Sequence, residues 1–154
     1  MSWGKPWALL LTRLVLGLIF FMAGWWKTFV LGPVEHARRL FIVPYAETFL
    51  PRWALWPVGT IIPIVELIAG GLVLVGLFRR AGYLALGAVL VVVTFGHLVK
   101  EALYPFHEHV IPRLGLLLIM LWSPLELDRF SLDGWLASGK REQGKGKREA
   151  EFGK

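Results

Sequence analysis

The sequence predicts an all-α integral membrane protein, a four-helix transmembrane bundle. The chain has 154 residues, 56% of them hydrophobic, and a mean hydropathy of +0.59. A soluble domain of this size cannot bury so much apolar surface, so the excess must face lipid. Runs of about twenty apolar residues can cross a hydrocarbon core of about 30 Å as helices. The apolar runs are Trp7–Trp26, Gly59–Phe78, Ala81–Val99 and Val110–Leu125.

The second and third runs form a predicted transmembrane hairpin around the basic turn Arg79-Arg80. Each arm contains one ionisable group within its apolar stretch, Glu66 in the first and His97 in the second. The fourth run has only sixteen residues, so it needs its flanking residues or a locally thin bilayer to span. The hairpin is the part of the chain around which the other two helices must pack.

The segments outside these runs divide the chain into a membrane domain, residues 1–136, and a tail, residues 137–154. The connection Lys27–Pro57 is predicted to lie on the outer membrane surface, with a short helix starting at Pro33. The tail is charged, rich in glycine and without apolar periodicity, which predicts disorder.

Cation distribution predicts the orientation. With both termini in the cytoplasm of a bacterial inner membrane, ten Lys and Arg residues lie inside and six lie outside or near the outer boundary, which agrees with the positive-inside rule. The ten are Lys5, Arg79, Arg80 and the seven from Arg129 onward; the six are Lys27, Arg38, Arg39, Arg52, Lys100 and Arg113. The basic tail is expected to meet an anionic leaflet, and no nucleic acid partner is expected.

Several chemistries are excluded or disfavoured by composition. The chain has no cysteine, which excludes disulfide exchange, thiol catalysis and cysteine-ligated iron–sulfur or zinc sites. His107, Glu108 and His109 are consecutive, but histidines two positions apart diverge on a helix, so no metal site is predicted. No residue is assigned as catalytic.

Polar residues repeat on one face of each predicted helix, at alternating steps of three and four. We call these faces the polar seams and expect them to face one another, because charges in lipid are costly. The seams are Arg13, Gly17, Phe20, Gly24 and Lys27; Gly59, Pro63, Glu66 and Gly70; Gly87, Leu90, Thr94, His97 and Glu101; and His109, Arg113, Leu116, Met120 and Ser123.

Depth along these seams predicts a ligand-binding site in the outer half of the bundle. Lys27, Glu66, His97 and Arg113 converge there, with Glu66 paired to Lys27, to Arg113 or to both. Arg13 lies near the inner end, where it is expected to snorkel or to meet Asp128 or Glu126. A purely structural role for these groups, holding helices together through ion pairs, stays open.

Three stretches resemble the DoxX family of small four-helix bacterial membrane proteins. They are LTRLVLGLIFFMAGWWKTF, VELIAGGLVLVGLFRRAGYLALGAVLVVVT and the closing SLD, within residues 8–133. The resemblance implies a link with thiosulfate:quinone oxidoreductase and other membrane redox assemblies. It also places Arg13, Lys27, Glu66, Gly70, Gly71, Arg80 and Asp133 at motif positions.

The predicted function is therefore a membrane subunit of a quinone-linked redox complex. No cofactor is expected to be held covalently; a lipid-soluble quinone is the expected ligand, and other membrane or redox subunits are the expected partners. His97, Lys27 and Arg113 can donate to quinone carbonyls, and His97 and a desolvated Glu66 can exchange protons. The alternatives left open are a non-catalytic scaffold or assembly subunit and a small transporter.

Overall fold

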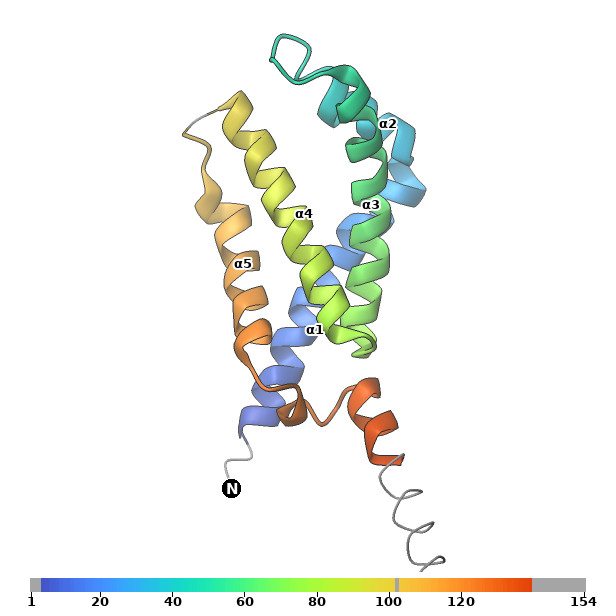
Figure 1. The fold of residues 1–154 in the computed structure, drawn as a ribbon, viewed down its shortest axis with the longest axis vertical. Helices are drawn as coiled ribbons and strands as arrows, with labels where there is room; N and C mark the ends of the chain where they lie inside the picture. Colours follow the sequence, from blue (N-terminus) through green and yellow to red (C-terminus); the bar gives the residue numbers. More distant parts are fainter. Residues whose placement is uncertain (1–3, 102, 140–154) are drawn as a thin grey trace, which may run out of the picture.

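The computed structural model describes residues 4–101 and 103–139, and within them every regular element is a helix. Four long helices run side by side (Figure 1). The long helices are α1 (Gly4–Trp25), α3 (Arg52–Val75), α4 (Arg79–Lys100) and α5 (Phe106–Trp122). The first and last described residues lie at the same end of the bundle, which we call the terminal end (Figure 1). The opposite end, which we call the connection end, carries residues 26–51.

Three helical segments are long and apolar enough to cross a membrane, which supports a multi-pass membrane protein. They are Gly4–Leu31, Arg52–Val75 and Arg79–Lys100. Large apolar side chains such as Leu11, Ile68 and Val91 remain exposed on these helices, as a lipid-facing surface requires. Helix α5 packs against α1 and α4 but has only 17 residues. The predicted all-α class is confirmed, whereas a fourth span stays a prediction.

Helix boundaries differ from the apolar runs at several places; helix α5, for example, begins and ends before the predicted Val110–Leu125. Helix α3 begins at Arg52, before the predicted Gly59, directly after Pro51, whose extended backbone (φ −73°, ψ 138°) forms the N-cap. The helix ends at Val75 because Gly76 adopts a left-handed conformation (φ 72°) and donates its N–H to carbonyl oxygens of the last turn. The predicted end at Phe78 was therefore three residues too late.

The connection is largely helical. Helix α1 continues as one π-helical segment, η1 (Trp26–Leu31), up to Gly32, whose φ of 86° breaks the helix. Helix α2 (Pro33–Ala37) then starts at the predicted proline and continues as η2 (Arg38–Ile42). Both α2 and η2 pack against α3. The predicted disordered tail lies mostly outside the described residues, which end at residue 139.

Glycines let α1 and α3 pack with their backbones in close approach. A Cβ atom added to Gly24 would lie 2.3 Å from the backbone nitrogen of Leu67, and one added to Gly70 would lie 2.5 Å from that of Phe21. Real Cβ atoms essentially never come so close, so only glycine fits at these two positions. The polar seams of α1 and α3 do face each other, because their glycines are the contact surface.

Helix α4 packs tightly only along its first half. Its buried residues run from Arg79 to Leu90, and none of its residues beyond Leu90 is buried. Toward the connection end, α4 and α5 lie apart from α3 (Figure 1). The polar seam of α4 is therefore only half buried, and space for a cavity remains beside its last three turns.

Two further short segments close the terminal end of the bundle. A 3₁₀ helix, η3 (Leu125–Leu127), follows α5, and residues 132–139 are helical. Ser131 accepts a hydrogen bond from the N–H of Gly134 through its hydroxyl, at 3.2 Å. This bond makes Ser131 the N-cap of the C-terminal helix.

Candidate functional site

An ion pair between α1 and α3 forms the centre of the connection-end site. The Lys27 ammonium donates to the Glu66 carboxylate, with 2.6 Å between Nζ and Oε2. Glu66 is buried and Lys27 is partly buried. A carboxylate in this position needs a close cation, because desolvation penalises its charged form. The predicted pairing of Glu66 with Lys27 is confirmed.

The structure does not bring Arg113 to this pair. Arg113 is on α5, which packs against α1 and α4, and its guanidinium carbon lies 5.8 Å from the centroid of the Phe20 ring. This geometry is a cation–π contact. No ion pair of Arg113 is present among the described residues, so the alternative pairing of Glu66 with Arg113 was wrong.

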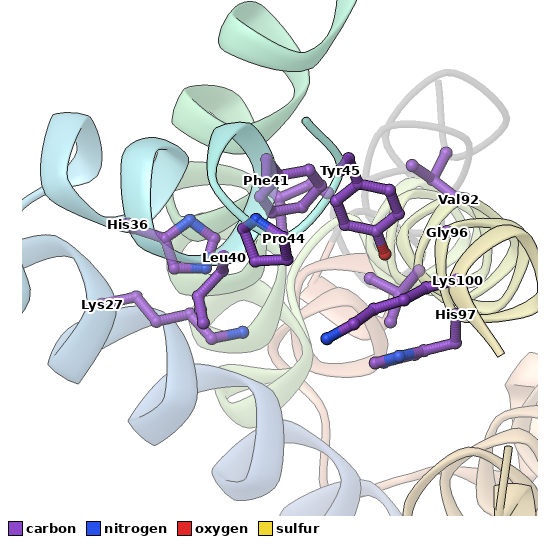
Figure 2. A pocket seen from close by; sticks show the side chains of 12 residues that line it. Lys27, His36, Leu40, Phe41, Pro44, Tyr45, Val92, Gly96, His97 and Lys100 are labelled. Atoms are coloured by element: carbon purple, nitrogen blue, oxygen red, sulfur yellow. The ribbon is translucent and has the colours of Figure 1, made fainter. Parts of the chain in front are cut away.

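A cavity of about 250 Å³ opens between the connection and α4 (Figure 2). Two of the predicted site residues, Lys27 and His97, line it, and Glu66 reaches it only through Lys27. Figure 2 shows Lys27 and Lys100 entering the cavity from opposite sides. The lining residues are Lys27, His36, Leu40, Phe41, Pro44, Tyr45, Ile62, Val92, Val93, Gly96, His97 and Lys100.

Two histidines line this cavity, and they differ in how firmly their rings are held. His36 is buried, and its Nδ1 lies 2.7 Å from the carbonyl oxygen of Gly59, so this nitrogen carries the proton and donates. Burial lowers the pKa of His36, against a smaller raising effect of that hydrogen bond. His97 is half-buried and stacks on Tyr104, with ring centroids 3.9 Å apart. His36 is therefore a fixed neutral donor, whereas neither ring nitrogen of His97 is hydrogen-bonded to a residue that the structure describes.

Sequence reasoning missed three polar lining residues, namely His36, Tyr45 and Lys100. The first two belong to the connection, which was predicted to lie on the membrane surface. The sequence signal for His36 and Tyr45 is weak: a proline at which α2 begins, with His36, Phe41 and Tyr45 spaced along the residues that follow. The hydroxyl of Tyr45 sits over Gly96, where an added Cβ would approach it to 2.9 Å. Only the folded chain shows that this glycine makes room for the tyrosine.

The Lys27–Glu66 pair predicts a definite mutational pattern. Lys27→Met and Glu66→Met should each destabilise the protein by about 2 kcal/mol, because each leaves a desolvated charge without its partner. The double variant should regain most of that loss. Denaturant titration in one detergent measures the cycle, and Arg113→Gln combined with Glu66→Gln is the matched control, expected to be additive. Additivity for Lys27 and Glu66 as well would contradict the pairing.

A second polar cluster, the terminal clasp, joins Arg13, Arg79, Asp128 and Asp133. Asp128 Oδ2 lies 3.1 Å from Arg13 Nε and 3.0 Å from Arg79 Nη1, and Arg79 Nε lies 3.2 Å from Asp133 Oδ2. Arg13, Arg79 and Asp128 are all buried. Of the partners predicted for Arg13, Asp128 is therefore correct, and no ion pair with Glu126 occurs among the described residues.

The clasp ties the segment after α5 to the turn between α3 and α4. The N–H groups of Phe78 and Arg79 donate to the Asp133 carboxylate, at 3.0 and 3.1 Å. Burial acts to raise the pKa of Asp133, but these bonds and the Arg79 guanidinium outweigh it and lower that pKa. Arg13 donates to the carbonyl oxygens of Val73, Leu74 and Phe130. The two arginines and two aspartates of the clasp balance in charge and make many hydrogen bonds. Both properties are typical of a structural element.

Metal ligation finds no support in the part of the chain that the structure describes. No group of three or more His, Asp or Glu residues converges there in a way that could hold a metal ion. His107 and His109 are exposed, and their Nε2 atoms lie 3.8 and 3.9 Å from the carboxylate oxygens of Glu108. The candidate site is the connection-end cavity, with its donors and its apolar walls.

The fold and this site define a class: a helical multi-pass membrane protein with a buried ion pair beside a donor-lined cavity. The sequence matches the family described as methylamine utilisation protein MauE over residues 5–107, so the chain belongs to the MauE family. No curated protein and no solved structure matches the chain. The match covers α1 to α4 and the whole connection, including every residue that lines the cavity.

The family match overturns the DoxX resemblance. The stretches that suggested DoxX are mostly apolar and rich in glycine, and the structure explains that pattern by close packing of α1 on α3. Any tightly packed pair of membrane helices selects small residues in this way. Of the two arginines in the turn, Arg79 makes the contact with Asp133. The link with thiosulfate:quinone oxidoreductase loses its basis.

Proposed function

We propose that this protein is a membrane subunit of a redox-linked system of the methylamine-utilisation type, and that its connection-end cavity binds the head group of a lipid-soluble quinone. The family description supports the first part, since it names methylamine utilisation. The system's other subunits are the expected partners. The second part rests on the cavity alone.

The observation that carries the quinone proposal is the placement of donors on opposite walls. A quinone ring has carbonyl acceptors at opposite ends and is otherwise apolar. Lys27 enters the cavity from the side of α1, and Lys100 and His97 enter from α4 (Figure 2). Phe41, Val92 and other apolar side chains complete the walls. Such a lining satisfies a few acceptors and excludes water from the rest, as small-molecule sites do.

Reduction of a quinone takes up two electrons and two protons. The chain has no cysteine, so the electrons would come from a redox partner in the same system. The protons need a titrating group within reach of the carbonyl oxygens, and an imidazole does this near neutral pH. His97 fits that role better than His36, because its ring is half-buried and not held by a backbone carbonyl.

The proposed placement in the membrane keeps four spans and both termini in the cytoplasm of a bacterial inner membrane. Two features support this placement. Helix α5 lies alongside α1 and α4 (Figure 1), and both described chain ends lie at the terminal end, together with the cations of the turn, Arg79 and Arg80. The cavity then faces the outer leaflet.

Binding of a soluble quinone analogue to the purified protein tests the proposal. Wild type should bind more analogue than lipid partitioning predicts. His97→Ala should weaken binding about tenfold, because it removes one hydrogen-bond donor from a desolvated site. Arg113→Gln is the matched control, because Arg113 lies outside the cavity, and it should bind like wild type. Wild-type binding no greater than partitioning, or equal binding by His97→Ala, would refute the quinone site.

A scaffold function is the second candidate, and one observation favours it. Lys27 and Glu66 satisfy each other at 2.6 Å and join α1 to α3, so the pair has a sufficient structural reason to exist. A scaffold subunit would keep its partner interface when the cavity is altered. Co-purification of the partner subunits with His97→Ala, without any quinone binding by wild type, is the result that this candidate predicts.

A further inference from the structure

The two arginines of the hairpin turn have different environments. Arg79 is buried, and its guanidinium contacts both carboxylates of the terminal clasp. Arg80 is exposed and makes no ion pair or side-chain hydrogen bond with any residue that the structure describes. One of the two cations is thus used by the fold, and the other is available for a ligand.

Arg80 lines a groove of about 400 Å³ between the start of α4 and the end of α5. The walls from the two helices are apolar, and Trp122, which is 92% exposed, stands at one edge. Tyr83 also lines the groove; it is 1% exposed, and its hydroxyl has no partner among the described residues. The lining residues are Arg80, Tyr83, Leu84, Met120, Leu121, Trp122, Ser123, Pro124, Leu125 and Glu126.

We propose that this groove binds an anionic phospholipid of the leaflet at the terminal end of the bundle. The phosphate would pair with Arg80, whose planar guanidinium suits phosphate oxygens. An acyl chain would lie along Leu84 and Leu121, which are 64% and 42% exposed and continue the lipid-facing surface of their helices. Basic pockets between membrane helices bind anionic head groups for these reasons.

The position of the groove fits a lipid better than a protein partner. It lies where the apolar helix surface gives way to polar residues, the level at which exposed tryptophans mark the membrane interface. Trp122 and Arg80 provide that aromatic and basic pair on neighbouring helices. Glu126 is the groove's one acidic residue, and its carboxylate opposes an anionic ligand. Removing this carboxylate should therefore tighten lipid binding, whereas removing the Arg80 charge should weaken it, so the proposal has two independent tests.

The test compares lipids added to the delipidated protein in a neutral detergent. Phosphatidylglycerol should raise the Tm, and phosphatidylcholine should have little effect. Arg80→Gln should weaken the apparent affinity for phosphatidylglycerol about tenfold, because a charge-assisted hydrogen bond is lost. Since the Arg80 side chain makes no ion pair or hydrogen bond with the described residues, this variant should fold like wild type. Glu126→Gln should tighten binding, because it removes the opposing charge.

Four outcomes would overturn the lipid proposal. The first is an equal response to phosphatidylcholine, and the second is an equal response to inorganic phosphate, which would mean a site for the free anion. The third is that Arg129→Gln, the matched control with an exposed cation outside the groove, loses as much affinity as Arg80→Gln. A Tm rise that accompanies dimer formation in light scattering would assign the groove to a second copy of the chain and would equally refute the proposal.

Discussion

Asp128→Ala is expected to lower the free energy of unfolding by about 3–5 kcal/mol, the cost typical of removing one partner from a buried ion pair. The Asp128 carboxylate is 2% exposed and touches both Arg13 and Arg79, so its loss leaves the buried Arg13 guanidinium without a counter-charge and leaves Arg79 with Asp133 alone. Denaturant titration of the protein in a single detergent measures the change.

The matched control for this variant is Glu126→Ala. Glu126 is two residues away, is exposed and forms no ion pair among the described residues, so its replacement should change stability by no more than about 0.5 kcal/mol. Asp128→Asn, which keeps the shape of the side chain, gives a second measurement if the alanine variant does not fold. Equal stability of Asp128→Asn and wild type would show that the clasp does not hold the terminal end together.

Gly70→Ala is expected to destabilise the protein by about 1–3 kcal/mol, as overpacking of a tight interface does. The added methyl group would lie 2.5 Å from the backbone nitrogen of Phe21, and a backbone atom within a helix cannot move aside cheaply. The two helices must then separate, which weakens the contact that also holds Lys27 against Glu66. Thermal unfolding in detergent measures the loss.

The neighbouring glycine provides the control. A Cβ atom on Gly71 would meet only the Phe21 ring, at 3.5 Å, which is ordinary contact. Gly71→Ala should therefore be neutral, or stabilising by up to about 1 kcal/mol, because alanine favours a helix more than glycine does. Gly24→Ala, on the facing helix, should reproduce the loss. Equal stability of the Gly70 and Gly71 variants would contradict the close approach of α1 and α3.

The candidate site was predictable where its residues lie inside an apolar run. Glu66 and His97 stand out because ionisable groups in such a run are costly, and Lys27 follows from the helical spacing of the first seam. Arg113 has the same spacing and was assigned wrongly. Spacing tells which residues share a face of one helix, but it does not tell which neighbouring helix that face meets.

The sequence alone determined that this is an all-α membrane protein, where its main helices lie, that cysteine chemistry is absent and that buried charges must be paired. These properties follow from composition and from the spacing of apolar and polar residues along the chain. Neither requires knowledge of long-range contacts. The tertiary structure decided which charges pair, which arginine of the turn is buried, and how the connection folds back to make a cavity with α4. These depend on contacts between residues far apart in the chain, such as Arg79 with Asp133, whose geometry is set by helix packing.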